Sequence, residues 1–291
     1  MEVVYGIGSY CCGSPSCVAV GSFDGLHIGH RKILGRLIEI AQQRGLRSVA
    51  VTFDPHPRQV LAPESRVSFV LSRSEKIEAF RSVGIDCLVV HPFSADLASL
   101  SGERFLNEML CRRLGMRYLV KGFNNHFGCD RLSDAAAIRR IGEESGFLVE
   151  EVDAVLSDGA QASSTMLRRL LADGDVRRAR EILGRLFPIT GIVGHGRMIG
   201  RSIGFPTANI ELDDDSKIIP AAGVYAALAE ADAAMWPAML NIGSNPTVNG
   251  DCSRLLLEAH LIGYKGNLYG QSVRLYLAER LRAEQKFPSL E

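Results

Sequence analysis

The first half of the chain alternates short apolar runs with longer amphipathic segments. Apolar runs bounded by turn residues predict strands over residues 18–20, 46–53, 86–91, 117–120 and 147–152. Between them, apolar residues recur at helical spacing over residues 31–44, 72–83, 101–114 and 135–145. Strands that alternate with helices predict an α/β fold with a doubly wound parallel sheet. Ligands of such sheets bind beyond the carboxyl ends of the strands.

The pattern changes after Leu183. Glycines are frequent between residues 188 and 209, and runs rich in β-branched, aliphatic and aromatic residues follow at 223–229, 239–243, 255–261 and 273–277. Strands at this spacing, without long helices between them, predict a small antiparallel β-barrel. We therefore expect an α/β domain over residues 1–184 and a barrel domain over residues 188–291, which suits a length of 291 residues.

Composition narrows the functional classes. Hydrophobic residues make up 46% and charged residues 23%, which is typical of a globular protein with a core. The 33 basic and 33 acidic residues cancel, which argues against a nucleic-acid partner. The seven cysteines are scattered without metal-binding spacing, which predicts reduced thiols in the cytoplasm. No signal peptide or apolar run of about 18 residues is evident, so no membrane partner is expected.

The first chemical motif follows the strand at residues 18–20. It reads Gly-Ser-Phe-Asp-Gly-Leu-His-Ile-Gly-His from Gly21 to His30. Glycines let backbone amides approach a ligand, and free amides at a helix start favour an anion. His27 and His30 are three residues apart and share one helix face. The motif predicts a phosphate site with two imidazoles; a strand–turn–helix corner with surface histidines is the alternative.

Two further loops are expected at the same edge of the sheet. Residues 54–57 read Asp-Pro-His-Pro, and the two prolines predict a loop rather than a helix. Residues 121–128 read Lys-Gly-Phe-Asn-Asn-His-Phe-Gly and follow another strand. Because the carboxyl ends of parallel strands meet at one edge, these loops and the histidine turn are predicted to converge on one crevice.

A second candidate phosphate site lies further along the chain. Three hydroxyl residues, Ser163, Ser164 and Thr165, open a predicted helix, and Arg168 follows one turn later. Hydroxyls, free amides and a guanidinium together suit a phosphate group. A plain Ser/Thr helix cap with a solvated arginine is the alternative interpretation.

In the barrel half, the informative string is Gly-Phe-Pro-Thr-Ala-Asn, residues 204–209. Thr207 and Asn209 are two apart on an extended backbone and point the same way. Both offer hard oxygen ligands suited to Mg²⁺ that also contacts nucleotide phosphates. Glu258 lies within an apolar strand and is a candidate general base, or else an outward-facing glutamate of an alternating strand.

Taken together, these strings resemble the bacterial bifunctional riboflavin kinase/FMN adenylyltransferases, the FAD synthetase family. The first half is similar in the Gly21–His30 string, in Ser163–Thr165 with Arg168, and in the 122–128 loop. Asn124 and Asn125 depart from the Asp and the aromatic or His residue that many members carry there. The resemblance implies ATP and phosphate binding by a set of ten residues: Gly21, Phe23, Asp24, Gly25, His27, His30, Ser163, Ser164, Thr165 and Arg168. It implies flavin contacts by Asn124, Asn125 and Phe127.

The second half is similar to the riboflavin kinase half of the same family. The matching strings are Pro206–Asn209, Gly223–Tyr225, Asn241–Thr247, Glu258–Leu261, Leu268–Gly270 and Arg282–Phe287. The resemblance implies ATP or flavin binding by five residues: Gly204, Pro206, Thr207, Asn209 and Asn241. Gly263 stands where an acidic or amide residue is usual. The sequence ends at Glu291, so the barrel domain is expected to lack the C-terminal helix that usually follows.

The resemblance implies a bifunctional transferase that makes FMN from riboflavin and then FAD from FMN, with Glu258, His27 and His30 as catalytic residues. Its expected substrates are ATP, riboflavin and FMN, with Mg²⁺ at Thr207 and Asn209. Two alternatives remain at this point. One is a flavin-binding sensor that uses the same pockets without turnover. The other is a nucleotidyltransferase for a different substrate or a synthetase-like RNA-binding protein.

Overall fold

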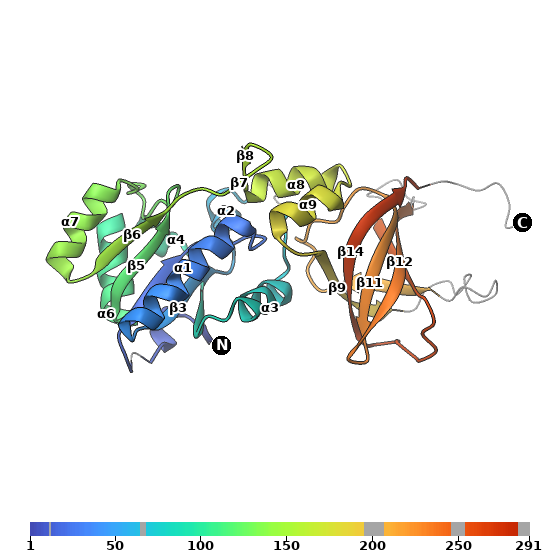
Figure 1. Ribbon diagram of the computed structural model, residues 1–291, viewed down its shortest axis with the longest axis horizontal. Coiled ribbons are helices and arrows are strands. Elements are labelled where there is room, and N and C mark those ends of the chain that lie inside the picture. The colour runs from blue at the N-terminus through green and yellow to red at the C-terminus, as the bar shows by residue number, and fades with distance from the viewer. Residues whose placement is uncertain (12, 65–67, 195–206, 246–253, 285–291) are drawn as a thin grey trace, which may run out of the picture. The chain divides into compact units, whose positions relative to one another are not determined.

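The computed structural model describes residues 1–11, 13–64, 68–194, 207–245 and 254–284 (Figure 1). The chain forms two compact units. The sheet unit comprises Met1–Val67 and Lys76–Ala162, and the barrel unit comprises Ser68–Glu75 and Ser163–Glu291. The second unit therefore contains a short segment that precedes most of the first unit in the sequence.

The sheet unit is built on a six-stranded sheet in the order β1-β4-β3-β2-β5-β6. The strands are β1 (Glu2–Tyr5), β2 (Ser16–Val20), β3 (Arg47–Phe53), β4 (Cys87–His91), β5 (Met116–Gly122) and β6 (Leu148–Val152). Every pairing in this sheet is parallel, which confirms the predicted α/β fold. All five residues of β2 are buried, so the strand that leads into the histidine turn lies in the middle of the core.

The helices of this unit largely follow the predicted periodicity. Their bounds are α1 (Ile28–Arg44), α2 (Pro57–Leu61), α3 (Arg73–Val83), α4 (Ala95–Ser99) and α7 (Ala135–Ser145). The segment predicted as one helix over residues 101–114 is divided into α5 (Gly102–Arg104), the π-helix η2 (Phe105–Cys111) and α6 (Arg112–Leu114). A 3₁₀ turn, η1 (Ile7–Ser9), and a two-stranded ribbon, β7 (Leu156–Ser157) with β8 (Ala160–Gln161), complete the unit.

One local prediction holds for residues 54–56 but is wrong at Pro57. The two prolines of residues 54–57 were expected to exclude helix, yet α2 begins at Pro57. Proline is tolerated at the first helical position because its missing N–H would have no intrahelical partner there. His56 caps this helix, since its Nδ1 accepts a hydrogen bond from the Arg58 amide at 3.1 Å.

The barrel unit contains a closed six-stranded barrel in the order β10-β13-β12-β11-β14-β9, as predicted. The strands are β9 (Phe187–Gly194), β10 (Ala208–Leu212), β11 (Gly223–Ala231), β12 (Ala234–Asn245), β13 (Arg254–Leu261) and β14 (Ser272–Arg282). All pairings are antiparallel. Alternate residues of β11, such as Tyr225, Ala227 and Ala229, are buried, so they fill the barrel while their neighbours face outward.

Two helices, α8 (Ser164–Ala172) and α9 (Val176–Leu183), group with the barrel by their contacts. Helix α9 packs against β14 and β9. Both helices precede the domain boundary expected at residues 184–188, but their contacts are mainly within the barrel unit. Hydrogen bonds add to that packing, since Ala221 in the approach to β11 donates its amide to the Leu171 carbonyl at 3.1 Å.

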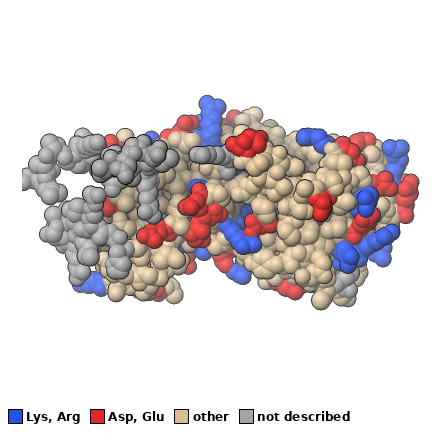
Figure 2. Space-filling view, turned by 180° about the vertical axis from the view of Figure 1, so that it is seen from behind, with Lys and Arg blue, Asp and Glu red and all other residues tan. Residues whose placement is uncertain are grey.

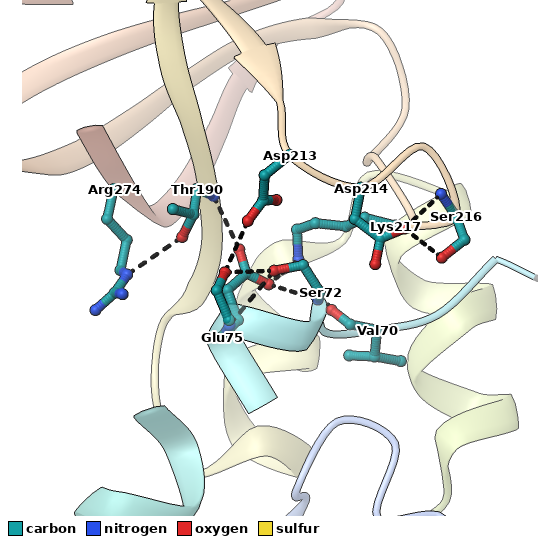
Figure 3. Close-up of polar contacts among 10 residues, drawn as sticks. Val70, Ser72, Glu75, Thr190, Asp213, Asp214, Ser216, Lys217 and Arg274 are labelled. Atoms are coloured by element: carbon teal, nitrogen blue, oxygen red, sulfur yellow. Dashed lines mark hydrogen bonds and ion pairs between the residues drawn. The ribbon is translucent and has the colours of Figure 1, made fainter. Parts of the chain in front are cut away.

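Residues 68–75 form the other unexpected part of the barrel unit (Figure 3). Phe69 pairs with Lys217 in an isolated parallel bridge. The buried Lys217 ammonium lies 2.5 Å from Glu75 Oε2 and donates to the Val70 carbonyl at 3.0 Å. The other Glu75 oxygen accepts the Thr190 amide at 2.8 Å. A buried ion pair thus joins this segment to the first barrel strand and to the loop before β11.

The surface carries no segregation of charge on the face shown in Figure 2, where acidic and basic side chains of the described residues are interspersed. This agrees with the balanced composition. Among the described residues, no helix has both the length and the apolar character needed to cross a membrane.

Candidate functional site

The turn between β2 and α1 has an unusual backbone. Phe23, Gly25 and Leu26 all have positive φ angles, of 47°, 87° and 41°. Such angles are uncommon for residues with a side chain and cost about 1–3 kcal/mol each, so they persist only where the surroundings fix them. Phe23 and Leu26 are both buried, which provides that fixation. The strained turn ends at His27, which is the N-cap of α1.

The two histidines of the motif form a stacked pair. Their ring centroids are 3.7 Å apart and their planes are 24° from parallel. A Cβ at Gly29 would lie 3.1 Å from the His27 ring, so the absence of a side chain there lets His27 adopt its position. Helix α1 has no side-chain cap at its N-terminus and no acidic residue in its first turn. Both features suit an anion at this helix start.

His30 is held in its neutral form. Burial lowers the pKa of its imidazole well below the ordinary value, and the charges of His27 and Lys76 lower this pKa further. The Phe23 ring packs edge-on against His30 with centroids 5.3 Å apart. Within the described residues, His30 Nδ1 is buried and makes no hydrogen bond to the protein. A neutral imidazole can offer a phosphate oxygen a hydrogen bond rather than a permanent positive charge.

The neighbouring strand ends contact this turn, as the predicted convergence requires. Asn125, in the loop after β5, donates its side-chain amide to the Val20 carbonyl at 2.8 Å. Thr52, near the end of β3, donates its hydroxyl to the Ser22 carbonyl at 3.1 Å. The residues 54–57 follow directly after β3. The parallel pairing of β2 with β3 and with β5 places these strand ends at one edge of the sheet, and the convergence of the loops on one crevice stays a prediction.

The three residues expected to contact flavin differ in their surroundings. Asn124 is exposed, whereas Asn125 is partly buried and its amide is bonded to β2. Phe127 is only 4% exposed and stacks on Phe105 with centroids 6.3 Å apart, so its ring belongs to the core of the unit. The large aromatic side chain that this loop exposes is Phe123, at 40%.

The second phosphate motif lies in the barrel unit at the start of α8. Ser163 is the N-cap, and its hydroxyl accepts the Met166 amide at 3.2 Å, as the helix-cap interpretation expects. Arg168 is partly buried and donates from Nε to the Ser68 carbonyl at 2.8 Å, so it is more than a solvated arginine. The first turn of α8 contains no acidic residue. The helix start thus keeps the positive character that a phosphate needs.

On the barrel, three predicted residues lie side by side. Asn209 of β10 pairs directly with Glu258 of β13, and Glu258 pairs directly with Asn241 of β12. Directly opposed residues on antiparallel strands place their side chains on the same face. Their neighbours Ile210, Leu257 and Ile242 are buried, so the row Asn209–Glu258–Asn241 faces outward and is partly buried. The outward orientation was one of the two interpretations of Glu258, and it sets the carboxylate between two amides.

The barrel unit also has a cavity of about 590 Å³, and Asn209, Glu258 and Asn241 are not among its lining residues. Its lining includes Thr207, Ala259 and Leu261, together with residues 264–269 of the loop between β13 and β14. This volume lies within the range typical of small-molecule sites. Thr207 is exposed and stands immediately before β10. Gly204 and Pro206, also expected at this site, lie outside the described residues.

Sequence reasoning missed several residues at both sites. Lys76 contacts the histidine turn at the Ser22 carbonyl, and Tyr264 lines the barrel cavity. The signal for the cavity loop was present in the Leu268–Gly270 string. Lys76 has no comparable signal, because it comes from a helix 54 residues away from Ser22 along the chain.

A parallel α/β unit with two stacked histidines at the end of a central strand, in one chain with a closed barrel that has a ligand-sized cavity, fits a two-part transferase acting on nucleotides. Residues 12–166 match a family described as FAD synthetase, and residues 183–291 match a family described as riboflavin kinase. The chain belongs to the bifunctional riboflavin kinase/FMN adenylyltransferase family.

Individual relatives support this assignment over the whole chain. A Pseudomonas fluorescens protein named bifunctional riboflavin kinase/FMN adenylyltransferase is 38% identical and covers 100% of this chain and 93% of its own length. The protein of the same name from Escherichia coli K12 is 34% identical, over 94% and 87%. A crystal structure described as a macrolide-efflux protein from Streptococcus pneumoniae superposes with a TM-score of 0.91 at 29% identity, over 100% and 94%.

Proposed function

We propose that the protein phosphorylates riboflavin to FMN in the barrel unit. We also propose that it adenylylates FMN to FAD at the histidine turn of the sheet unit. The observation that carries the proposal is the Asn209–Glu258–Asn241 row in a chain that also contains the stacked His27–His30 pair. The Asn209–Glu258–Asn241 row suits phosphoryl transfer to a hydroxyl, and the His27–His30 pair suits the binding of phosphates. Membership of the family supports assigning one reaction to each set.

In the kinase reaction, Glu258 accepts the proton of the 5′-hydroxyl of riboflavin's ribityl chain. The hydroxyl oxygen then forms a bond to the γ-phosphorus of ATP while the bond from that phosphorus to ADP breaks. Amide side chains on both sides of Glu258 orient the carboxylate and the substrate hydroxyl. The protein's contribution is mainly positioning and charge stabilisation, as in other phosphoryl transfers.

Thr207 and Asn209 are the proposed ligands of Mg²⁺. The Thr207 side chain is exposed at the cavity, and Asn209 lies beside Glu258, so a hydroxyl and an amide oxygen are available next to the proposed ATP site. These are ligands of the kind that Mg²⁺ accepts alongside water and phosphate oxygens. When bound, the ion would neutralise charge on the phosphates of ATP.

In the adenylyl transfer, an oxygen of the FMN phosphate forms a bond to the α-phosphorus of ATP, and the bond to pyrophosphate breaks. The phosphate nucleophile is already largely ionised at pH 7, since its second pKa is about 6, so no strong base is needed. His27 and His30 donate hydrogen bonds to phosphate oxygens whose charge increases during transfer. Ser163, Ser164, Thr165 and Arg168 bind the pyrophosphate portion, and Asn124, Asn125 and Phe127 contribute on the flavin side.

The product pattern tests the whole proposal. The chain is incubated with riboflavin, ATP and Mg²⁺, and the flavins are separated by chromatography over time. FMN should appear first and FAD should follow, while FMN supplied without riboflavin should also become FAD. Tight flavin binding with no ATP-dependent product would contradict the proposal. As part of the same proposal, the enzyme acts in the reducing cytoplasm, which suits its scattered cysteines.

A further inference from the structure

Lys76 contacts the histidine turn from a different element. It lies on α3, is partly buried, and donates from Nζ to the Ser22 carbonyl at 3.3 Å. The same carbonyl also accepts the Thr52 hydroxyl at 3.1 Å. Ser22 follows Gly21 directly after β2, so this carbonyl lies where the strand becomes the turn. Two donors from two elements therefore fix its direction.

The turn needs such support because of its backbone. Phe23 and Leu26 both carry side chains at positive φ, a conformation that relaxes unless neighbouring groups prevent it. Helix α3 supplies a second contact through Phe80, whose ring packs edge-on against Phe23 with centroids 5.3 Å apart. Lys76 and Phe80 are four residues apart and share one face of α3. One helix face thus holds two consecutive residues of the turn.

Lys76 also brings charge to a place where phosphates are expected. An ammonium group is a compact point charge, which favours an anion bound nearby. Its field reaches His30, because it contributes to the lowered pKa of that imidazole. The contact with Ser22 and the effect on His30 are separate observations. Both place the ammonium beside the turn that begins α1.

We propose that Lys76 is a positioning residue for adenylyl transfer: its ammonium holds the Ser22 carbonyl and so keeps residues 21–27 in the shape that receives the phosphates of ATP. This inference rests on the proposed function of the turn. It extends that function to a residue from α3, which lies outside the motif itself.

The test compares three full-length variants. Lys76→Met removes the charge and the hydrogen bond, Lys76→Arg keeps both a charge and a donor, and Arg81→Gln removes a positive charge from an exposed position on the same helix. FAD formation from FMN and FMN formation from riboflavin are measured on each. Lys76→Met should lower kcat/KM for FAD formation by about 10- to 100-fold, the cost of a small misplacement at a reacting centre. Lys76→Arg should retain most of the activity, and Arg81→Gln should behave as the unchanged protein.

A pH profile separates positioning from simple stabilisation. The groups that act on the pKa of His30 are His27 from its own turn and Lys76 from α3. Removing the Lys76 charge removes one cause of the lowered pKa, so the pKa of His30 should rise. The acid limb of FAD formation should then move to higher pH in Lys76→Met and stay in place in Lys76→Arg and Arg81→Gln.

The outcomes are distinct. Loss of FAD formation with a shifted acid limb and unchanged FMN formation supports the inference. FAD formation in Lys76→Met equal to that of Arg81→Gln overturns it, and so does an equal loss of both activities with an unshifted pH profile. Failure of the unmutated chain to convert FMN to FAD would overturn the proposed function instead, and it is recognised without any substitution.

Discussion

The two candidate sites are built in opposite ways. In the sheet unit, the site is a strained turn at the end of a buried strand, and its shape depends on residues from β3, α3 and the loop after β5. In the barrel unit, the central residues lie on three adjacent strands and face outward in one row. The first site is made by a loop that other elements hold, and the second by the regular register of a sheet.

The two sites differ in what holds their side chains in position. In an antiparallel sheet, neighbouring side chains are placed by the same hydrogen bonds that form the barrel, so no extra support is needed. A turn at positive φ has no such ladder and needs specific donors and packed rings. Substitutions around the turn should therefore affect its reaction from a distance. On the barrel, effects should be confined to the row itself.

The largest effect should come from Glu258→Gln. The amide cannot accept the proton of the hydroxyl, so FMN formation from riboflavin should fall by about 10²- to 10⁴-fold, the usual contribution of a general base. FAD formation from supplied FMN should be unchanged. Both rates are measured by chromatography, and Glu279→Gln, an exposed glutamate on β14, is the matched control. An equal loss in both reactions would remove the distinction between the sites.

The buried pair Glu75–Lys217 should affect stability more than any surface pair. Glu75→Gln leaves the Lys217 ammonium buried without its carboxylate, which should cost about 3–5 kcal/mol of unfolding free energy. Trp236 is the single tryptophan and lies on β12, so its fluorescence during denaturant unfolding reports on the barrel unit.

The control for this pair is Glu230→Gln, which breaks the more exposed pair with Arg274 and should cost about 1 kcal/mol or less. Replacing both members, by Glu75→Leu with Lys217→Met, should recover much of the loss because no charge is left buried. Equal stability of Glu75→Gln and Glu230→Gln would show that residues 68–75 do not support the barrel.

The variant His27→Ala tests the candidate site of the sheet unit. Losing one donor to the transferring phosphates should reduce FAD formation by about 10²- to 10³-fold, while FMN accumulates from riboflavin. The kinase reaction of the same molecules is the internal control. A fall in FMN formation of the same size would contradict the assignment of the turn to adenylyl transfer.

The smallest effect should come from Ser163→Ala. Loss of the α8 cap should cost about 1 kcal/mol of stability. The KM for ATP in FAD formation should also rise if the hydroxyl contacts phosphate. The control is Asp175→Ala, which removes the comparable cap of α9. The Asp175 carboxylate accepts the Arg178 amide at 3.0 Å. If both variants change ATP binding alike, Ser163 is a cap and nothing more.

Local patterns predicted most elements of the fold because each depends on periodicity within a short window. The strand β1 escaped prediction since it has only four residues, of which Val4 alone is buried. Ser72 and Glu75 form a capping box at the start of α3, with the Ser72 amide donating to Glu75 at 3.0 Å. Its further partner Lys217 lies 142 residues away, and no local pattern encodes that pairing.

The sites show the same limit. The sequence contains Asn209, Asn241 and Glu258, but only the strand register shows that they are direct neighbours. It also contains the His-x-Gly-His string, but the stacking of the rings and the burial of His30 depend on packing from Phe23. Residue types and spacing thus identify the chemistry, whereas orientation depends on contacts between distant segments.

The place of residues 68–75 in the barrel unit bears on how the two activities could be separated in evolution. A gene split near the apparent boundary would give a kinase that begins around residue 183 and retains Lys217 but not Glu75. Its ammonium would then lose the ion pair with Glu75. A free-standing barrel should therefore be more stable when residues 68–75 are kept at its N-terminal side than when it begins at residue 183.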